Sequence, residues 1–182
     1  SIRQFQHDVG HDNAILIHVT LIPYLRASGE MKTKPTQASV KELQGMGIQP
    51  DVLVCRSEYP LTEDIRGKIA LFCNVPVSNV LQNLDVEYLY EAPLAMEREK
   101  LADVVLQSLR LENRKPDLTD WENMVENLRH PDKTVKIAMV GKYTQLHDAY
   151  LSVVEALKHG GISPGWTPKN SMKKIWIRLS IL

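Results

Sequence analysis

The chain of 182 residues has a hydrophobic content of 43%, and its 22 basic side chains balance its 22 acidic ones. The length suits one ordinary domain, or one domain with part of another, and the composition supports a real core. A neutral chain without an apolar run of about 18 residues predicts neither a nucleic-acid partner nor a membrane partner.

The cysteines and the first residues favour a cytoplasmic protein. Cys55 and Cys73 are too few for a disulfide framework, and they lie too far apart in sequence for a zinc site. We therefore expect two reduced core thiols and no metal site. Residues 1–4 open an amphipathic stretch and not a signal peptide.

The first elements lead to the carboxyl end of a strand. Residues 1–9 predict the end of an amphipathic helix that has no N-cap. Residues 14–21 are apolar and β-branched, which predicts a buried parallel strand. His18 inside it is expected to be a hydrogen-bonded core residue and not a catalyst. Residues 24–31 then form a loop at the edge where open α/β sheets bind ligands.

The next six residues join two lysines to the start of a predicted helix. Pro35 suits the first helical position, and the helix is expected to end near residues 45–47. A helix start offers free N–H groups and partial positive charge to an anion. The pattern predicts a polyphosphate site, or else a solvated helix start that carries lysines. The six residues are Lys32, Thr33, Lys34, Pro35, Thr36 and Gln37.

A second strand and helix add further candidates. Residues 51–55 predict a short strand, and Arg56 after it is either a purine or phosphate contact or a surface salt-bridge partner. Residues 62–72 predict a helix with Thr62 as its N-cap. Lys68 and Phe72 are four apart and share a face. Either the two side chains bind the phosphate and the base of a nucleotide, or one of them faces solvent and the other lies in the core.

The following segments complete an alternating pattern. Residues 75–81 predict a strand, residues 83–86 a turn, and residues 88–92 another possible strand. Residues 94–109 predict a helix in one or two pieces. Alternating strands and helices indicate an α/β fold with a doubly wound parallel sheet.

A polar linker separates this part from a second α/β beginning. Thr119 opens a capping-box pattern for a helix that extends to about Leu128. A buried strand at 135–140 and a helix at 148–159 predict the first β–α unit of another domain. The tail is expected to be an isolated strand or frayed. The predicted divisions are 1–110, the linker 111–134, 135–162, and the divergent tail 163–182.

Long blocks of this sequence resemble the CTP synthase family, from about residue 1 to residue 162. The carrying blocks are LIPY at 21–24, ASGEMKTKPTQ at 27–37, VKEL at 40–43, KIALFCNV at 68–75, VGKY at 140–143 and DAY at 148–150. The resemblance implies that residues 1–110 are the second half of the synthase, or amidoligase, domain. It also implies that residues 135–162 begin a class I glutaminase domain.

The resemblance implies a reaction and a set of contacts. In this family ATP phosphorylates O4 of UTP, and ammonia from glutamine then displaces phosphate to give CTP. The implied partners are UTP, CTP, ATP, glutamine and further copies of the chain in a homotetramer. Residues matching the family's UTP and CTP site are Lys32, Thr33, Lys34, Pro35, Thr36, Gln37, Lys68 and Phe72; those matching its ATP site are Arg56, Leu84, Asp85 and Val86.

Some expected family parts are missing from the 182 residues. The sequence holds no G-x-x-x-x-G-K-[ST] loop, and neither cysteine matches the glutaminase nucleophile. The Mg²⁺ ligands that accompany ATP in the family are likewise not found. We expect no catalytic residue here and neither half-reaction from the chain alone. CTP formed from ATP, UTP and ammonia by the purified chain would contradict this expectation.

Two other interpretations stay open at this point. The chain is alternatively a non-catalytic fragment that binds a pyrimidine nucleotide or serves oligomerisation. A third interpretation is another phosphate-loop amidoligase, of the dethiobiotin synthetase kind. The glutaminase-like segment after the linker argues against the third.

Overall fold

The computed structural model describes residues 1–130, 134–143, 146–162 and 176–181. It divides into two units, Ser1–Pro116 and Asp117–Leu182, which are described separately.

A three-stranded parallel sheet organises the first unit, with the strand order β1-β4-β5. Its strands are β1 (Ile17–Ile22), β4 (Val52–Ser57) and β5 (Val80–Leu84). Ile17 lies opposite Val52, and Leu53 lies opposite Val80. The predicted α/β class and parallel sheet are therefore confirmed. All three strands end at one edge of the sheet, called here the carboxyl edge.

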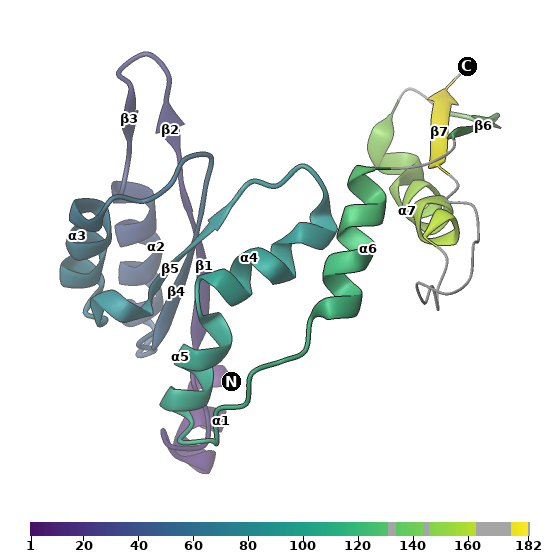
Figure 1. The fold of residues 1–182 in the computed structure, drawn as a ribbon. Helices are drawn as coiled ribbons and strands as arrows, with labels where there is room; N and C mark the ends of the chain where they lie inside the picture. The colour runs from purple at the N-terminus through teal and green to yellow at the C-terminus, as the bar shows by residue number, and fades with distance from the viewer. Residues whose placement is uncertain (131–133, 144–145, 163–175, 182) are drawn as a thin grey trace. The chain divides into compact units, whose positions relative to one another are not determined.

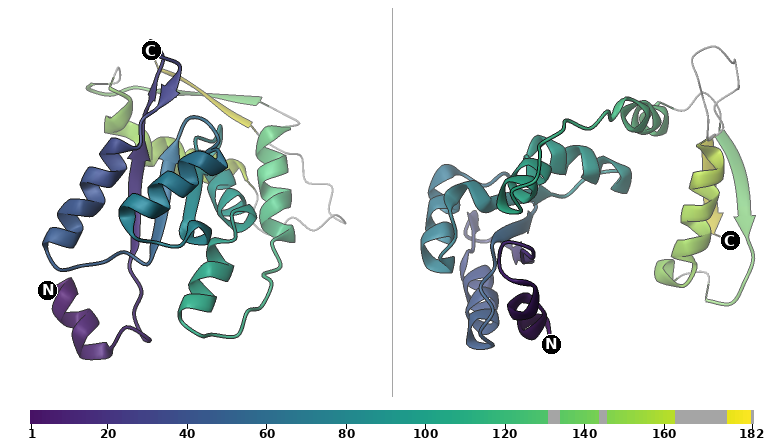
Figure 2. Two further views of the ribbon diagram at one scale, coloured as in Figure 1. Left: turned by 90° about the vertical axis from the view of Figure 1, so that its left-hand side faces the viewer. Right: turned by 90° about the horizontal axis from the view of Figure 1, so that it is seen from below.

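Helices lie on both sides of this sheet (Figure 1). One side carries α2 (Lys34–Gly45) and α3 (Glu63–Cys73), which lie in front of the sheet in the left view of Figure 2. The other side carries α4 (Ala92–Arg98) and α5 (Leu101–Ser108). The remaining elements of this unit are α1 (Ile2–Val9), the hairpin β2 (Tyr24–Leu25) and β3 (Glu30–Met31), and the 3₁₀ turns η1 (Val77–Asn79) and η2 (Leu89–Glu91).

Two predictions in the later part of this unit had different outcomes. The possible strand at 88–92 is wrong, because η2 occupies 89–91 and α4 begins at Ala92. The predicted helix at 94–109 does form two pieces. Lys100 separates them in a left-handed conformation, with φ of 61°. An α-helix does not continue through that conformation, so the chain changes direction there.

The core lies between the sheet and the helices α2 and α3. Val40, Leu53, Ile69 and Val80 are all at most 1% exposed and belong to one apolar cluster. The first four residues of β4 are buried on both faces, as a central strand with helices on both sides requires. Burial of this cluster is the main stabilising contribution to the unit.

The edge strand β1 is buried on one face only, so its predicted full burial is wrong. Thr20 and Ile22 are buried, whereas Val19 and Leu21 are each 59% exposed. Successive side chains of a strand point to opposite faces. The Thr36 hydroxyl of α2 contacts Thr20, so the exposed residues lie on the face away from α2.

The helix caps also test the sequence analysis. Ser1 caps α1 in a capping box with Gln4, so the prediction that this helix has no N-cap is wrong. Thr62 caps α3 as predicted, and its hydroxyl accepts a 3.3 Å bond from the Ile65 amide. Thr119 is the first residue of its helix, and its hydroxyl bonds to Asp117, so the predicted capping box is wrong.

The described residues of the second unit form a parallel pair of strands and three helical segments. The strands β6 (Thr134–Met139) and β7 (Trp176–Ile181) pair in parallel. Strand β7 lies within the predicted divergent tail, whose residues 163–175 and 182 lie outside the described part. The helical segments are α6 (Thr119–Arg129), η3 (His147–Tyr150) and α7 (Leu151–Gly161). Among the described residues of the whole chain, no helix is long and apolar enough to cross a membrane.

Candidate functional site

The carboxyl edge brings three polar segments of the first unit together. The hairpin and the lysine-bearing segment follow β1, Glu58 follows β4, and Asp85 follows β5. The hairpin contacts the segment after β4 in two ways. The Tyr24 and Tyr59 ring centroids lie 4.3 Å apart, and Arg26 Nη2 lies 3.1 Å from Glu58 Oε1. These contacts fix the hairpin against its neighbour at this edge.

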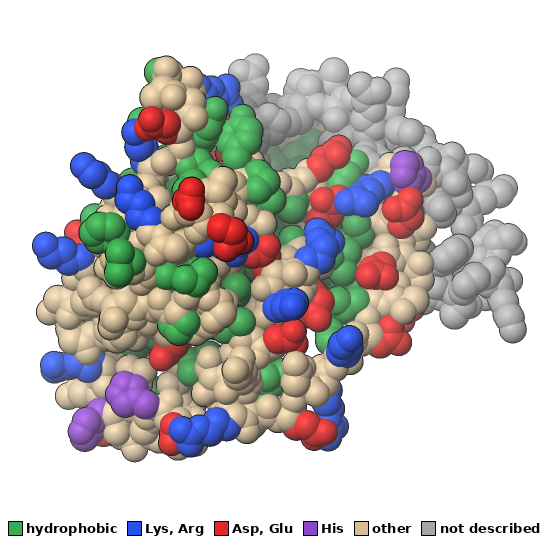
Figure 3. Space-filling model, turned by 60° about the vertical axis from the view of Figure 1, so that its left-hand side comes forward, with side chains coloured by type: hydrophobic (Ala, Val, Ile, Leu, Met, Phe, Trp, Pro, Cys, Tyr) green, Lys and Arg blue, Asp and Glu red, His purple; other side chains and the backbone are tan. Residues whose placement is uncertain are grey.

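Figure 3 shows basic and hydrophobic side chains close together on the surface formed by the hairpin, α2 and α3. That combination suits a ligand with an anionic end and an apolar end. The residues that carry it have very different surroundings.

The Thr36 hydroxyl points into the protein. Thr36 is fully buried, and its Oγ1 lies 3.1 Å from both the Leu21 carbonyl oxygen and Thr20 Oγ1. These hydrogen bonds hold the first turn of α2 against the end of β1. Any contribution of this side chain to ligand binding therefore acts through the position of the helix.

Thr33 and Gln37 form a second internal contact. Thr33 is 6% exposed, and its Oγ1 accepts a 3.1 Å hydrogen bond from Gln37 Nε2. Thr33 caps α2 by position, but its side chain makes no capping bond to the helix backbone. Pro35 is the second residue of α2, so the helix begins one residue before the predicted position, and the missing N–H of Pro35 still leaves no bond unmade there.

The two lysines of this segment differ from each other. The side chain of Lys34 is exposed and forms neither an ion pair nor a hydrogen bond with the described residues. Lys32 forms an ion pair with Glu30. The hydrogen bond and charge of Lys32 lower the pKa of the Glu30 carboxyl. The backbone N–H of Lys32 also donates a 2.9 Å bond to the Pro23 carbonyl, which fixes the exit from β3.

Lys68 and Phe72 both lie on the outer face of α3. Lys68 is exposed, Phe72 is 61% exposed, and Ile69 and Cys73 are fully buried on the inner face. The interpretation that places Phe72 in the core is therefore wrong. The Lys68 side chain has no bonding partner among the described residues. A cation and an aromatic ring are thus both accessible on one helix face.

The residues predicted for ATP meet at the ends of β4 and β5. Arg56 Nη2 lies 3.4 Å from Asp85 Oδ1, and both side chains are more than half exposed. The Asp85 amide donates to the Ser57 carbonyl at 3.2 Å, which extends the ladder past Leu84. The predicted turn at 83–86 therefore begins too early, since β5 includes Leu84. Val86 is half-buried beside this pair.

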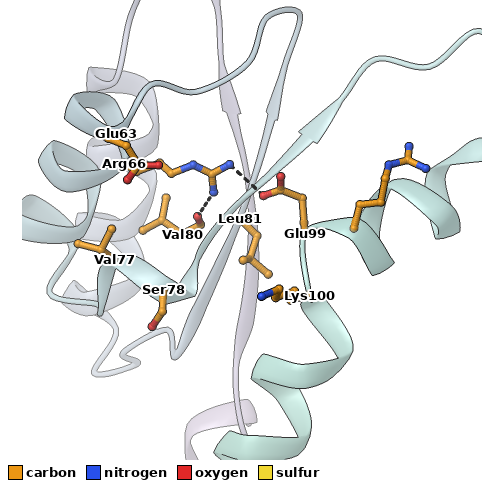
Figure 4. Close-up of a pocket in the computed structure, with 9 residues that line it drawn as sticks. Glu63, Arg66, Val77, Ser78, Val80, Leu81, Glu99 and Lys100 are labelled. Atoms are coloured by element: carbon orange, nitrogen blue, oxygen red, sulfur yellow. Dashed lines mark hydrogen bonds and ion pairs between the residues drawn. The ribbon is translucent and has the colours of Figure 1, made fainter. Parts of the chain in front are cut away.

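A polar network that the sequence analysis missed lies at the start of β5 (Figure 4). Glu99 accepts hydrogen bonds from Arg66 at 3.0 Å and from the Gln82 backbone and side chain at 3.1 and 2.8 Å. It lies beside a hollow of about 310 Å³. The two partners Arg66 and Glu99 are 33 residues apart, so no local spacing reveals them.

His18 and the cysteines occupy structural positions. His18 Nε2 lies 2.9 Å from Ser39 Oγ, which confirms that this residue is hydrogen-bonded within the fold. Cys55 and Cys73 are both buried free thiols in the same apolar cluster. Burial raises the pKa of Cys73 to about 11 and also raises that of Cys55. Neither thiol is accessible as a nucleophile.

Comparisons with known proteins give one consistent family. A family model described as CTP synthase N-terminus matches residues 1–111. The CTP synthase of Ruminiclostridium cellulolyticum is 59% identical over 162 residues, which cover 89% of this chain and 30% of the relative. The CTP synthases of Acaryochloris marina and Symbiobacterium thermophilum are 55% and 57% identical over 165 and 163 residues, again 30% of each relative.

Two facts follow from these matches. The chain spans about 30% of the length of the curated relatives. Their matches are also longer than the 111 residues that the family model covers, so the similarity continues into the second unit.

Proposed function

The chain belongs to the CTP synthase family, and from that premise we propose that its carboxyl edge binds the pyrimidine nucleotide in the ATP-dependent conversion of UTP to CTP. In the proposed reaction ATP phosphorylates O4 of UTP, and ammonia released from glutamine then displaces that phosphate. The observation that carries the proposal is the start of α2, where Lys34 is free of partners among the described residues beside a firmly held helix end.

A nucleoside triphosphate carries several negative charges and needs several cations. Lys32, Lys34 and Lys68 are the cations of the proposed site, and the N–H groups at the start of α2 add a partial positive charge. Thr33, Thr36, Pro35 and Gln37 shape and hold this helix start. Phe72 presents an accessible ring for the base.

The ATP part of the proposal uses the other end of the carboxyl edge. Arg56, Leu84, Asp85 and Val86 lie together there and are proposed to contact the adenine. Among the described residues, no three side chains of histidine, cysteine, aspartate or glutamate form a cluster that could hold a metal ion. The proposal places Mg²⁺ on the phosphates of ATP and names no ligand for it among these residues.

The place of the chain within its longer relatives is also a proposal. We assign residues 1–110 to the later part of the synthase domain, 111–134 to a linker, and 135–162 to the start of a glutaminase domain. The family-model match to Leu111 and the unit boundary after Pro116 support this division. The β6–α7 unit supports the α/β character of the last part.

Ligand-dependent thermal stability tests the proposed nucleotide site. A ligand that binds only the folded state raises the melting temperature with its concentration. We expect CTP and UTP to do so for the 182-residue chain, and Lys34→Ala to abolish most of the shift. An unchanged shift in that variant would contradict the proposed site.

Lys41→Ala is the matched control. Lys41 is an exposed lysine on the same helix without a bonding partner among the described residues. It lies seven positions after Lys34, about 10 Å from it along the helix axis. Because the two substitutions change net charge equally, a shift lost only in Lys34→Ala assigns binding to the helix start.

The exposed ring of Phe72 also bears on assembly. A base held only by a ring that is 61% exposed would be open to water on its other side. We propose that a further copy of the chain encloses it, in keeping with a homotetramer. Sedimentation with and without CTP tests this, because the nucleotide is expected to increase the assembled fraction.

A further inference from the structure

We infer that Glu30 lowers the affinity of the nucleotide site for its ligand, because the Glu30 carboxylate competes with a ligand phosphate for the Lys32 ammonium. The inference rests on the proposed function, since it assumes that Lys32 contacts the phosphates. It adds a residue that opposes binding to a set of residues that favour it.

The local backbone places the two side chains together. Glu30 and Met31 form β3, and Lys32 follows directly. Alternate residues of an extended segment point to the same side, so residues 30 and 32 face one way and residue 31 faces the other. Met31 packs against the apolar core, and the Lys32 amide bonds to Pro23. These two backbone anchors keep the Glu30 and Lys32 side chains on the same side of the segment and close together.

The other two lysines of the proposed site have no such competitor. Lys34 and Lys68 are exposed and have no acidic partner among the described residues, whereas the Lys32 side chain is 40% exposed and paired with Glu30. Because Lys32 lowers the pKa of the Glu30 carboxyl, Glu30 is ionised at neutral pH. A ligand phosphate can therefore pair directly with Lys34 and Lys68, whereas the charge of Lys32 is already neutralised by Glu30.

The competition weakens binding in two steps. A phosphate must first displace the Glu30 carboxylate from Lys32. The displaced carboxylate then stays close to the phosphate and repels it. The Glu30 side chain is 60% exposed, so solvent screens both effects. A moderate weakening favours exchange of the nucleotide at the site.

A double-mutant cycle with CTP as the probe tests the inference. Dissociation constants are measured by calorimetry for the 182-residue chain and for Glu30→Gln, Lys32→Ala and the double variant. We expect Glu30→Gln to tighten CTP binding about two- to fivefold at low salt. In the Lys32→Ala background the same change should have a smaller effect, because the competition for Lys32 is gone and only the repulsion between the Glu30 carboxylate and the phosphate remains.

Glu58→Gln is the matched control. Glu58 is another exposed acid at the carboxyl edge, but its partner is Arg26. Its neutralisation should leave the CTP affinity nearly unchanged. Equal tightening in Glu30→Gln and Glu58→Gln would show a general charge effect and overturn the inference.

The remaining outcomes separate this inference from the proposed function. If the unmodified chain binds CTP and Glu30→Gln binds it equally well, or gains equally with and without Lys32, the role of Glu30 is wrong and the nucleotide site stands. If the unmodified chain binds neither CTP nor UTP, the proposed function fails and the inference fails with it. Circular dichroism of each variant checks that the substitutions leave the fold intact.

Discussion

The start of α2 is held by internal hydrogen bonds, whereas the outer face of α3 has no comparable support. Thr36 and Thr33 direct their hydroxyls inward to Leu21 and Gln37. Lys68 and Phe72 extend into solvent, and the Phe72 ring is 61% exposed. Both regions are proposed to bind one pyrimidine nucleotide, yet only the first is ordered by contacts within the chain.

This difference separates two kinds of binding residue. A backbone fixed before the ligand arrives loses little conformational entropy on binding, which favours affinity. An exposed cation and ring gain less until another surface excludes water from them. The start of α2 is therefore expected to bind phosphates in a single chain. The face of α3 is expected to contribute fully only when a further copy covers it.

The largest expected effect in this comparison comes from Thr36→Val. Valine keeps the shape but removes the hydroxyl, which leaves the Leu21 carbonyl and the Thr20 hydroxyl without this partner. Loss of a buried hydrogen bond of this kind costs about 2 kcal/mol. We expect the free energy of unfolding, measured by urea denaturation, to fall by that amount, and CTP binding to weaken with it.

Thr36→Ser is the control for this prediction, because it retains the hydroxyl. It should recover most of the lost stability and the CTP affinity. If Thr36→Val unfolds at the same urea concentration as the unmodified chain, the start of α2 is not held by this side chain. The contrast between the two regions would then lose its physical basis.

The next largest expected effect is a pH-dependent change in stability that comes from Cys73 on the inner face of α3. Burial raises the pKa of Cys73 from its ordinary 9.0 to about 11. Between these values the unfolded chain releases a proton that the folded chain keeps. Stability from this thiol is therefore complete below about pH 9 and is lost as the pH rises towards 11, a change of roughly 2 kcal/mol.

Urea denaturation at pH 8 and pH 10.5 measures this loss in the unmodified chain and in Cys73→Ala. Other groups titrate in the same range, so the informative quantity is the difference between the two proteins. Cys73→Ala should lose less stability over this interval. An identical loss in both would show that the Cys73 thiol ionises as readily in the folded chain as in the unfolded one.

Local patterns in the sequence predicted some parts of this unit well. The proline of α2, the Thr62 cap of α3 and the helical character of residues 94–109 depend on nearby residues alone. The full burial predicted for β1 failed because β1 is an edge strand with one exposed face. Strand order is a property of the whole sheet, so the apolar run itself does not reveal which strand lies at the edge.

In the candidate site, too, local spacing predicted some features and contacts between distant residues determined the others. Spacing identified the cations of the lysine segment and the shared face of Lys68 and Phe72. It did not reveal that Thr36 is turned inward, because that depends on the distant Leu21 carbonyl. It also did not reveal that the Arg56 side chain lies beside Asp85, because the two residues come from different strand ends. Contacts between separate elements are what sequence spacing does not specify.

A smaller effect is expected at the adenine end of the carboxyl edge. The Arg56–Asp85 pair is separated by 3.4 Å and is more than half exposed. Screening by solvent limits such a pair to about 0.5 kcal/mol. Asp85→Asn should therefore change the urea midpoint only slightly, while it weakens ATP binding in calorimetry. A large loss of stability would show a structural role and argue against a ligand contact.

The smallest effect on stability is expected for Phe72→Ala, with Leu71→Ala as its matched control. Both side chains are mostly exposed on α3, at 61% and 79%, so each substitution should change the free energy of unfolding by less than about 0.5 kcal/mol. Only Phe72→Ala should weaken CTP binding, because only Phe72 offers an aromatic ring to the base. The loss should also grow with protein concentration if a further copy encloses the base. A loss of equal size in dilute and concentrated protein would show that α3 binds the base within one chain, and the proposed contrast with α2 would then be wrong.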